Sequence, residues 1–303
     1  MPPANEGYVR VTGGKIWYKI VGKRKNKPPL LTLHGGPGAP HDYLEPLAAL
    51  SDERPVIFYD QLGCGLSEKP RDKKLWTIER FVEELSQLQK ALKIKAFHLL
   101  GVSWGSMLAV CYIARKHPDN ILSLTLSGPY LNSALWDKDQ RRYIQALPEE
   151  VKRVILDCEA RESCDSPQYR QAMEIYYKKH VCNLDPWPAC LKRALKKFNQ
   201  DIYGYMWGPS EFTIRGTLKD ADATPLLKNI RIPALLTCGR WDEASPETTR
   251  IYRDLLPNSR MVIFEGATHS HYLEKKNEYL DLLRVFLMST EKDNNLLNER
   301  KIK

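Results

Sequence analysis

A serine flanked by glycines carries the strongest chemical signal in the sequence. The segment GVSWG, residues 101–105, follows the apolar run AFHLL and precedes the helix-like run SMLAVCYIA. A serine on a sharp strand-to-helix turn exposes its hydroxyl, and the close approach of strand and helix leaves no room for side chains at Gly101 and Gly105. This context predicts Ser103 as a nucleophile, with the amide of Trp104 directed at a developing oxyanion. The alternative is an ordinary Gly-Ser turn.

A second glycine-rich segment supplies another candidate donor. HGGPG, residues 34–38, follows the apolar run LLTL. Backbone amides approach a substrate carbonyl closely only where side chains are absent, which gives Gly35 and Gly36 a function. We therefore expect this loop to complete an oxyanion hole with Trp104, and a plain Gly-Pro loop is the alternative. His34 is interpreted as structural, because the base is expected after the serine in chain order.

The acid and the base of a triad are expected after the serine, in that order. The runs IPALLTCGRWD and RMVIFEGATH end in Asp242 and His269. Both residues thus follow strand-like runs, and parallel sheets carry their chemistry at the carboxyl ends of their strands. The imidazole would accept the proton of Ser103 and return it to the leaving group, while the carboxylate would fix the tautomer of the imidazole. Three nearby residues are rivals for these roles: His271, Glu243 and Asp254.

Alternating strand and helix patterns must position these residues. Short β-rich runs, each closed by Gly, Pro or a polar residue, alternate with helical patterns such as TIERFVEELSQLQKALKI and SMLAVCYIARKHP. This alternation predicts an α/β protein with a mostly parallel central sheet flanked by helices. The strand-like runs are KIWYKIVG, PPLLTLHGG, PVIFYDQ, AFHLLGVS, ILSLTLSGP, IPALLTCGR and RMVIFEGA.

The alternation of strand and helix patterns is interrupted in the middle of the chain. Residues 130–222 lack strand-like runs and contain helical patterns such as DQRRYIQAL, PEEVKRVILDCEA and SPQYRQAMEIYYKKHV. We therefore expect residues 1–129 and 223–303 to form the core and residues 130–222 to form an inserted helical cap, or lid.

The composition and charge of the chain argue against several classes of partner. The chain has 303 residues, 43% of them hydrophobic and 27% charged, without an apolar run of membrane length, so no membrane association is expected. The first residues, MPPANEGYVRV, do not resemble a secretory signal, so we expect a cytoplasmic location. The net charge of +9 is spread over amphipathic segments without a nucleic-acid-binding motif, so no nucleic acid is expected. The seven cysteines include no C-x-x-C pair, so neither disulfides nor a metal are expected, and a Ser-His-Asp triad needs no cofactor.

Taken in order, the motifs resemble those of proline iminopeptidases (prolyl aminopeptidases), and the archaeal tricorn-interacting type in particular. The resemblance runs from about residue 17 to residue 287 and is carried by HGGPG, FYDQLGCGLS, GVSWGS, WGPSEFT, GRWDE and ATHSHYLE. It implies an α/β-hydrolase fold and a serine peptidase that removes an unblocked N-terminal residue, preferably proline, from short peptides. The resemblance also implies that Ser103, Asp242 and His269 form the triad, with Glu274 matched five residues after the histidine.

The resemblance further implies a role for two carboxylates outside the triad. Glu211 in WGPSEFT and Glu243 beside the acid match positions that bind the free amino terminus of the substrate in this family. A cation removed from water needs opposite charge nearby, and two carboxylates would discriminate against blocked peptides. The expected partners are therefore short peptides or aminoacyl amides with a free N-terminus. Three cap aromatics are expected to wall a pocket for the proline ring: Tyr205, Trp207 and Phe212.

Other functions stay open at this point. An amino-acid amidase or a small-molecule esterase would use the same triad, and a binding protein that kept the fold without catalysis is a third possibility. An esterase would be indifferent to blocking of the substrate amine. The motifs do not specify the oligomeric state.

Overall fold

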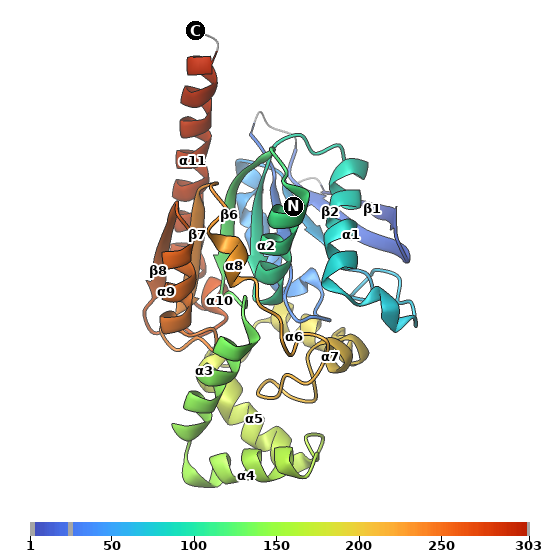
Figure 1. Ribbon diagram of the computed structural model, residues 1–303, viewed down its shortest axis with the longest axis vertical. Coiled ribbons are helices and arrows are strands. Elements are labelled where there is room, and N and C mark those ends of the chain that lie inside the picture. The colour runs from blue at the N-terminus through green and yellow to red at the C-terminus, as the bar shows by residue number, and fades with distance from the viewer. Residues whose placement is uncertain (1–3, 24–26, 302–303) are drawn as a thin grey trace.

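The computed structural model describes residues 4–23 and 27–301. Its centre is an eight-stranded sheet in the order β1-β2-β4-β3-β5-β6-β7-β8 (Figure 1). Strands β1 and β2 pair antiparallel, as do β2 and β4, and the remaining pairs are parallel. The predicted α/β class with a mostly parallel sheet is therefore confirmed. The strands are β1 (Ala4–Val11), β2 (Gly14–Val21), β3 (Leu30–Leu33), β4 (Val56–Tyr59), β5 (Phe97–Val102), β6 (Ile121–Ser127), β7 (Ala234–Gly239) and β8 (Ser259–Phe264).

Helices cover both faces of this sheet, which explains why its central strands read as continuous apolar runs. Alternation along β5 assigns successive side chains to opposite faces. Leu99 packs in a cluster with helices α1 (Ile78–Ala91) and α2 (Trp104–Lys116). Leu100 packs in a second cluster with the 3₁₀ helix η1 (His41–Asp52) and α11 (Lys276–Lys301). Four short or peripheral helices complete this part of the fold: η2 (Lys73–Leu75), α8 (Thr224–Leu227), α9 (Pro246–Leu255) and α10 (His271–Glu274).

Strand β1 is absent from the predicted strands. It lies at the edge of the sheet, and most of its residues are exposed. Only Val9 and Val11 are buried, while its first half, ANEG, lacks the β-branched and aromatic residues that favour strands. Its pairing with β2, which sets Tyr8 opposite Trp17, depends on the neighbouring strand more than on its own composition.

Six helices lie between β6 and β7, and the five that precede α8 lie at one end of the sheet (Figure 1). They occupy the segment expected to form the cap, and the term cap is kept here for residues 130–222. Helices α4 and α5 form a hydrophobic cluster of their own with Phe212, whereas α6 packs against η1 of the core. The cap helices are α3 (Ser133–Gln145), α4 (Glu149–Ala160), α5 (Pro167–His180), α6 (Ala189–Lys196) and α7 (Gln200–Met206). Within the described residues, no helix is both long and apolar enough to cross a membrane.

Candidate active site

The turn between β5 and α2 holds Ser103 in a strained conformation. Its backbone has φ 54° and ψ −122°, and a non-glycine residue in such a region costs about 1–3 kcal/mol. A Cβ at Gly101 would lie 2.3 Å from the carbonyl oxygen of Gly105, and a Cβ at Gly105 would lie 2.2 Å from that of Leu33. The surrounding structure therefore requires glycine at both positions, and the turn places the serine at the N-terminus of α2.

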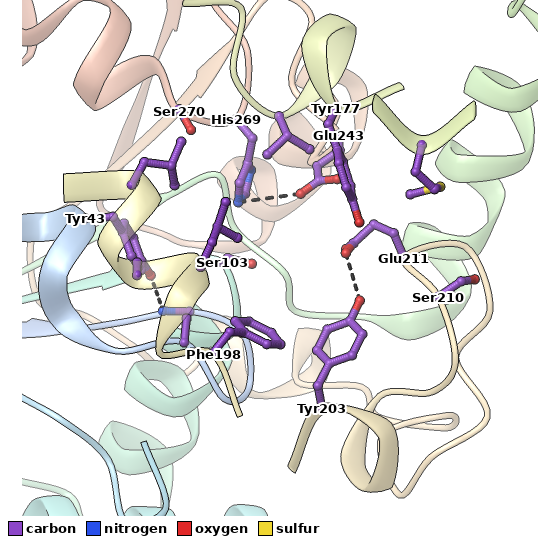
Figure 2. A pocket seen from close by; sticks show the side chains of 18 of the residues that line it. Tyr43, Ser103, Tyr177, Phe198, Tyr203, Ser210, Glu211, Glu243, His269 and Ser270 are labelled. Carbon is purple, nitrogen blue, oxygen red and sulfur yellow. Dashed lines mark hydrogen bonds and ion pairs between the residues drawn. The ribbon is translucent and has the colours of Figure 1, made fainter. Parts of the chain in front are cut away.

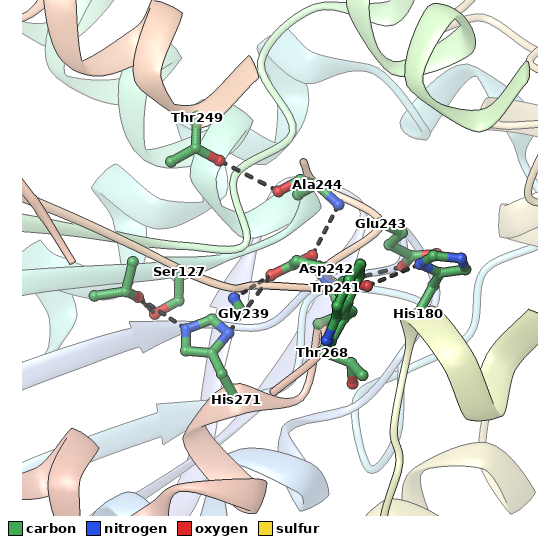
Figure 3. A network of polar contacts seen from close by, with 12 residues as sticks. Ser127, His180, Gly239, Trp241, Asp242, Glu243, Ala244, Thr249, Thr268 and His271 are labelled. Carbon is green, nitrogen blue, oxygen red and sulfur yellow. Dashed lines mark hydrogen bonds and ion pairs between the residues drawn. The ribbon is translucent and has the colours of Figure 1, made fainter. Parts of the chain in front are cut away.

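Asp242 and His269 come together after β7 and β8. The Nδ1 atom of His269 lies 2.7 Å from Oδ1 of Asp242. The carboxylate is fully buried and also accepts hydrogen bonds from the amides of Ala244 (2.8 Å) and Gly239 (3.1 Å) (Figure 3). Burial raises the pKa of Asp242, but the charge and hydrogen bond of His269 outweigh burial, and the pKa is lowered to about 2. The acid is thus ionised at neutral pH and fixes one edge of the imidazole.

The other edge of the His269 ring faces a cavity. Ser103 and His269 both line this cavity, and Nε2 of His269 lies 3.8 Å from Oε1 of Glu243 (Figure 2). Burial lowers the pKa of His269, but the surrounding carboxylates, Asp242 and Glu243 foremost, raise it to about 9. Among the described residues, no hydrogen bond joins the Ser103 hydroxyl to His269. In enzymes without substrate such bonds are often long, and they tighten only in the complex.

The rival residues for acid and base lie elsewhere. His271 is fully buried, with Nε2 2.9 Å from the Thr237 hydroxyl and Nδ1 3.6 Å from Oδ2 of Asp242. It does not line the cavity. Asp254 is exposed on α9 and pairs with Arg253 at 2.6 Å. Neither is positioned to exchange a proton with Ser103.

The predicted oxyanion donors differ in what they contact. Trp104 is the first residue of α2, so its amide has no partner within the helix. The amide of Gly35 donates to the hydroxyl of Tyr43 (Figure 2). A Cβ atom at Gly35 would lie 3.0 Å from the Cβ atom of Ser103. Gly36 lines the cavity with φ +112°. The HGGPG loop thus approaches the serine closely, with one of its amides already bound to a tyrosine.

His34 is held inside the protein. Its Nε2 accepts a hydrogen bond from the amide of Gln61 at 2.9 Å, and its Nδ1 lies 3.0 Å from the carbonyl oxygen of Gly35. Burial lowers the pKa of His34 to about 4, so the ring is neutral at neutral pH. These contacts fix the loop that carries Gly35.

Glu211 and Glu243 line the same cavity as Ser103 (Figure 2). The hydroxyl of Tyr203 donates to Oε2 of Glu211 at 2.8 Å, and that of Tyr176 lies 3.4 Å from Oε2 of Glu243. Desolvation raises the pKa of Glu211, and desolvation together with repulsion from Glu211 raises the pKa of Glu243 well above its ordinary value. Two desolvated carboxylates that repel each other form a site that a cation would stabilise.

The aromatic residues expected around the proline ring are not those that line the cavity. Trp207 and Phe212 are buried in hydrophobic clusters, and Tyr205 packs against Trp76 with ring centroids 5.6 Å apart. None of the three lines the cavity, so this prediction is wrong. For Tyr205 the reason is helical geometry, because it follows the cavity-lining Tyr203 by two residues on α7 and points in a different direction. The aromatic residues that do line it are Tyr43, Tyr169, Tyr177, Trp187, Phe198, Tyr203 and Tyr272.

A cap histidine that carries no sequence motif connects the loops of the site. The carbonyl oxygen of His180, the last residue of α5, accepts hydrogen bonds from the amides of His269 (3.0 Å) and Glu243 (3.3 Å). Its Nδ1 lies 2.8 Å from the carbonyl oxygen of Trp241 (Figure 3). Glu274 anchors the same region by accepting hydrogen bonds from the amide and hydroxyl of Thr268, each at 2.6 Å. The positions of His269 and Glu243 therefore depend on the cap as well as on the sheet.

Comparison with known proteins identifies the family of this chain. Residues 28–276 match the family model of the α/β hydrolase fold. A proline iminopeptidase from Heyndrickxia coagulans is 44% identical over 285 residues, which cover 94% of this chain and 99% of that protein. The proline iminopeptidase of the archaeon Saccharolobus solfataricus is 38% identical over 288 residues, with coverages of 93% and 92%.

Solved structures give the same result. The crystal structure of a proline iminopeptidase from Mycobacterium smegmatis matches with a TM-score of 0.89 at 32% identity and covers 96% of this chain and 100% of that one. The crystal structure of VinJ matches with a TM-score of 0.91 at 33% identity and covers 95% and 100%. The expected α/β-hydrolase fold and the family resemblance are confirmed. The chain belongs to the proline iminopeptidase family of α/β hydrolases.

Proposed function

We propose that this protein is a serine aminopeptidase that removes an N-terminal residue, preferably proline, from short peptides. One observation carries the proposal: two desolvated carboxylates, Glu211 and Glu243, share a cavity with Ser103 and the paired His269. A hydrolase for neutral acyl groups has no need of such a pair, because desolvated carboxylates cost free energy unless a cation offsets them. The names of the relatives support the same reading.

The reaction begins with binding of the substrate ammonium group between Glu211 and Glu243. This contact fixes the first residue and brings its carbonyl carbon to the Ser103 hydroxyl. The added positive charge also weakens the attraction that holds a proton on His269, whose Nε2 lies 3.8 Å from Glu243. Binding of the correct substrate therefore favours the neutral imidazole that the next step requires.

Acyl transfer then proceeds in two halves. His269 removes the proton of Ser103 as the oxygen attacks, and Asp242 stabilises the imidazolium that forms. The amide of Trp104, with one from the Gly35–Gly36 loop, stabilises the oxyanion. His269 donates its proton to the leaving amine, and the acyl group stays on Ser103. Water, activated by the same histidine, hydrolyses the ester and releases the free amino acid.

The experiment that tests this function compares matched substrates with free and acetylated amines. We expect prolyl 4-nitroanilide to be hydrolysed and N-acetylprolyl 4-nitroanilide to be resistant, with kcat/KM lower by at least about a hundredfold. Leucyl and alanyl anilides measure the preference for proline. Equal turnover of the free and acetylated substrates would instead support the esterase or amidase alternative. Unchanged turnover by Ser103→Ala would place catalysis outside this site.

A further inference from the structure

The cavity above Ser103 is larger than a prolyl group requires. Its volume is about 530 Å³. Cavities of about 300–1,000 Å³ accommodate drug-sized ligands, whereas a prolyl group is one small ring with a carbonyl. The remaining space must hold another part of the substrate, water, or both.

The two ends of the cavity belong to different parts of the fold. Tyr169 and Met173 of α5 line one end and pack in the cluster that contains Phe212, next to Glu211. Leu191 and Ala194 of α6 line the other end and pack in the cluster that contains Tyr43 and Val102 of the core. In Figure 2, Ser103 and His269 lie between the glutamates on one side and Tyr43 on the other.

The α6 end is apolar. Its lining includes Trp187, Leu191, Ala194 and Leu195. Two cationic residues of this region pair with Asp42 and do not line the cavity: Lys197 lies 2.8 Å and Arg193 lies 3.4 Å from its Oδ1 atom. Leu195 lines the cavity and is also 49% exposed, so it lies at the mouth of the cavity.

The order of groups in a peptide relates these two ends to the scissile bond. With the α-amine at the glutamates and the carbonyl carbon at Ser103, the leaving group must extend away from the glutamates. That direction leads past the serine toward Tyr43 and α6. We infer that the α6 end of the cavity is a subsite for the side chain that follows the scissile bond, and that it selects large apolar residues at that position. This inference rests on the proposed aminopeptidase function.

The test uses prolyl dipeptide amides. Amidation removes the negative charge of the C-terminal carboxylate, so that the substrates differ only in the side chain of the second residue. The series is Pro-Gly-NH₂, Pro-Ala-NH₂, Pro-Leu-NH₂ and Pro-Phe-NH₂, and released proline is quantified. Burial of a larger apolar side chain is worth about tenfold or more in kcat/KM. We therefore expect the phenylalanine and leucine substrates to exceed the glycine substrate by at least about tenfold. Because kcat/KM covers steps through acylation, the shared prolyl-enzyme does not mask the difference.

Two variants connect the preference to α6. Ala194→Leu fills the subsite, and Leu195→Asn makes its mouth polar without changing the buried core. Each is expected to lower the ratio of kcat/KM for Pro-Phe-NH₂ over Pro-Gly-NH₂ at least about threefold. Leu255→Asn is the matched control, because Leu255 is a 38% exposed leucine on α9 that does not line the cavity. Its ratio should equal that of the unmodified protein.

The outcomes separate this inference from the proposed function. Equal kcat/KM across the four amides, or a preference that both α6 variants leave intact, would overturn the subsite while leaving the aminopeptidase activity established. Absence of hydrolysis of every prolyl amide, together with hydrolysis of simple esters, would overturn the proposed function and the subsite with it. A preference for phenylalanine that falls in both α6 variants, and not in Leu255→Asn, supports the subsite.

Discussion

Replacement of Glu243 by glutamine tests the amine site and its coupling to the base at once. Glutamine keeps the size of the side chain and removes its charge. Glu243 is 5% exposed, lines the cavity with Glu211, and lies 3.8 Å from Nε2 of His269. The substitution should therefore weaken binding of the substrate cation and lower the pKa of His269.

The size of the expected fall in kcat/KM follows from the burial of the charge pair between Glu243 and the substrate cation. Removing one partner of a buried charge pair costs about 2–5 kcal/mol. Glu211 remains in the variant, and because repulsion and desolvation raise the pKa of Glu243, the empty site does not hold two full charges. The lower part of the range applies, about 2–3 kcal/mol, which corresponds to a fall of about 30- to 150-fold in kcat/KM for prolyl 4-nitroanilide.

The same substitution should also shift the pH dependence of the reactivity of Ser103 to lower pH. The pKa of His269 is raised to about 9, so the free enzyme holds a protonated base below that pH and becomes reactive as the pH rises through it. Loss of the Glu243 charge lowers this pKa, and the rise in reactivity should move to lower pH. A fluorophosphonate, which carries no amine, reports this step without interference from titration of the substrate. The assay is its rate of reaction with Ser103 between pH 6 and about pH 10.

Glu247→Gln is the matched control, because Glu247 lies close in sequence but is 59% exposed and pairs with Arg142 at 3.0 Å. Its kcat/KM and pH profile should be those of the unmodified protein. A value of kcat/KM for Glu243→Gln within about threefold of that protein would refute the amine site. An unchanged pH profile of phosphonylation would refute the coupling between Glu243 and His269.

Two further predictions concern the geometry of the base and of the amine site. A Cβ at Gly128, where φ is +51°, would lie 2.6 Å from Nδ1 of His269, so Gly128→Ala should lower kcat by about a hundredfold through displacement of the ring. Gly266→Ala is the control, because its backbone has a similar strain, with φ +69°, but open space surrounds the added Cβ atom. It should change only the melting temperature. Equal kcat values in the two variants would contradict this account. Tyr203→Phe removes the hydroxyl that donates to Glu211 at 2.8 Å, a bond to a charged group worth about 1.5–3 kcal/mol. Its KM for free-amine anilides should rise more than kcat falls, and an effect confined to kcat would rule out a role in amine binding.

The parts of the site that the sequence predicts are those with local geometric causes. The turn at Ser103 is recognisable because glycines within two residues on each side allow the strand and helix to meet. Asp242 and His269 follow buried strands, and the carboxyl ends of parallel strands meet at one edge whatever the loops contain. The strands themselves are predictable where both faces are covered, because burial demands apolar residues at every position.

The remaining parts depend on contacts between distant segments. Tyr203 faces Glu211 and Tyr205 faces Trp76, and this choice depends on how α7 docks onto the core. The contact of Tyr43 with the amide of Gly35 likewise follows from the packing of η1 and has no sequence signature. His180 affects the site through its carbonyl oxygen, a group that every residue possesses. Pattern and periodicity do not encode such contacts.

The most direct measurement is the identity of the covalent intermediate. A prolyl ester accelerates acylation, so rapid quenching in acid during turnover should trap the prolyl group on the enzyme. Mass spectrometry of the digested protein is predicted to find that group on the peptide containing Ser103, and to find none in Ser103→Ala. Full turnover of the ester by Ser103→Ala, or a prolyl adduct on another residue, would contradict the account.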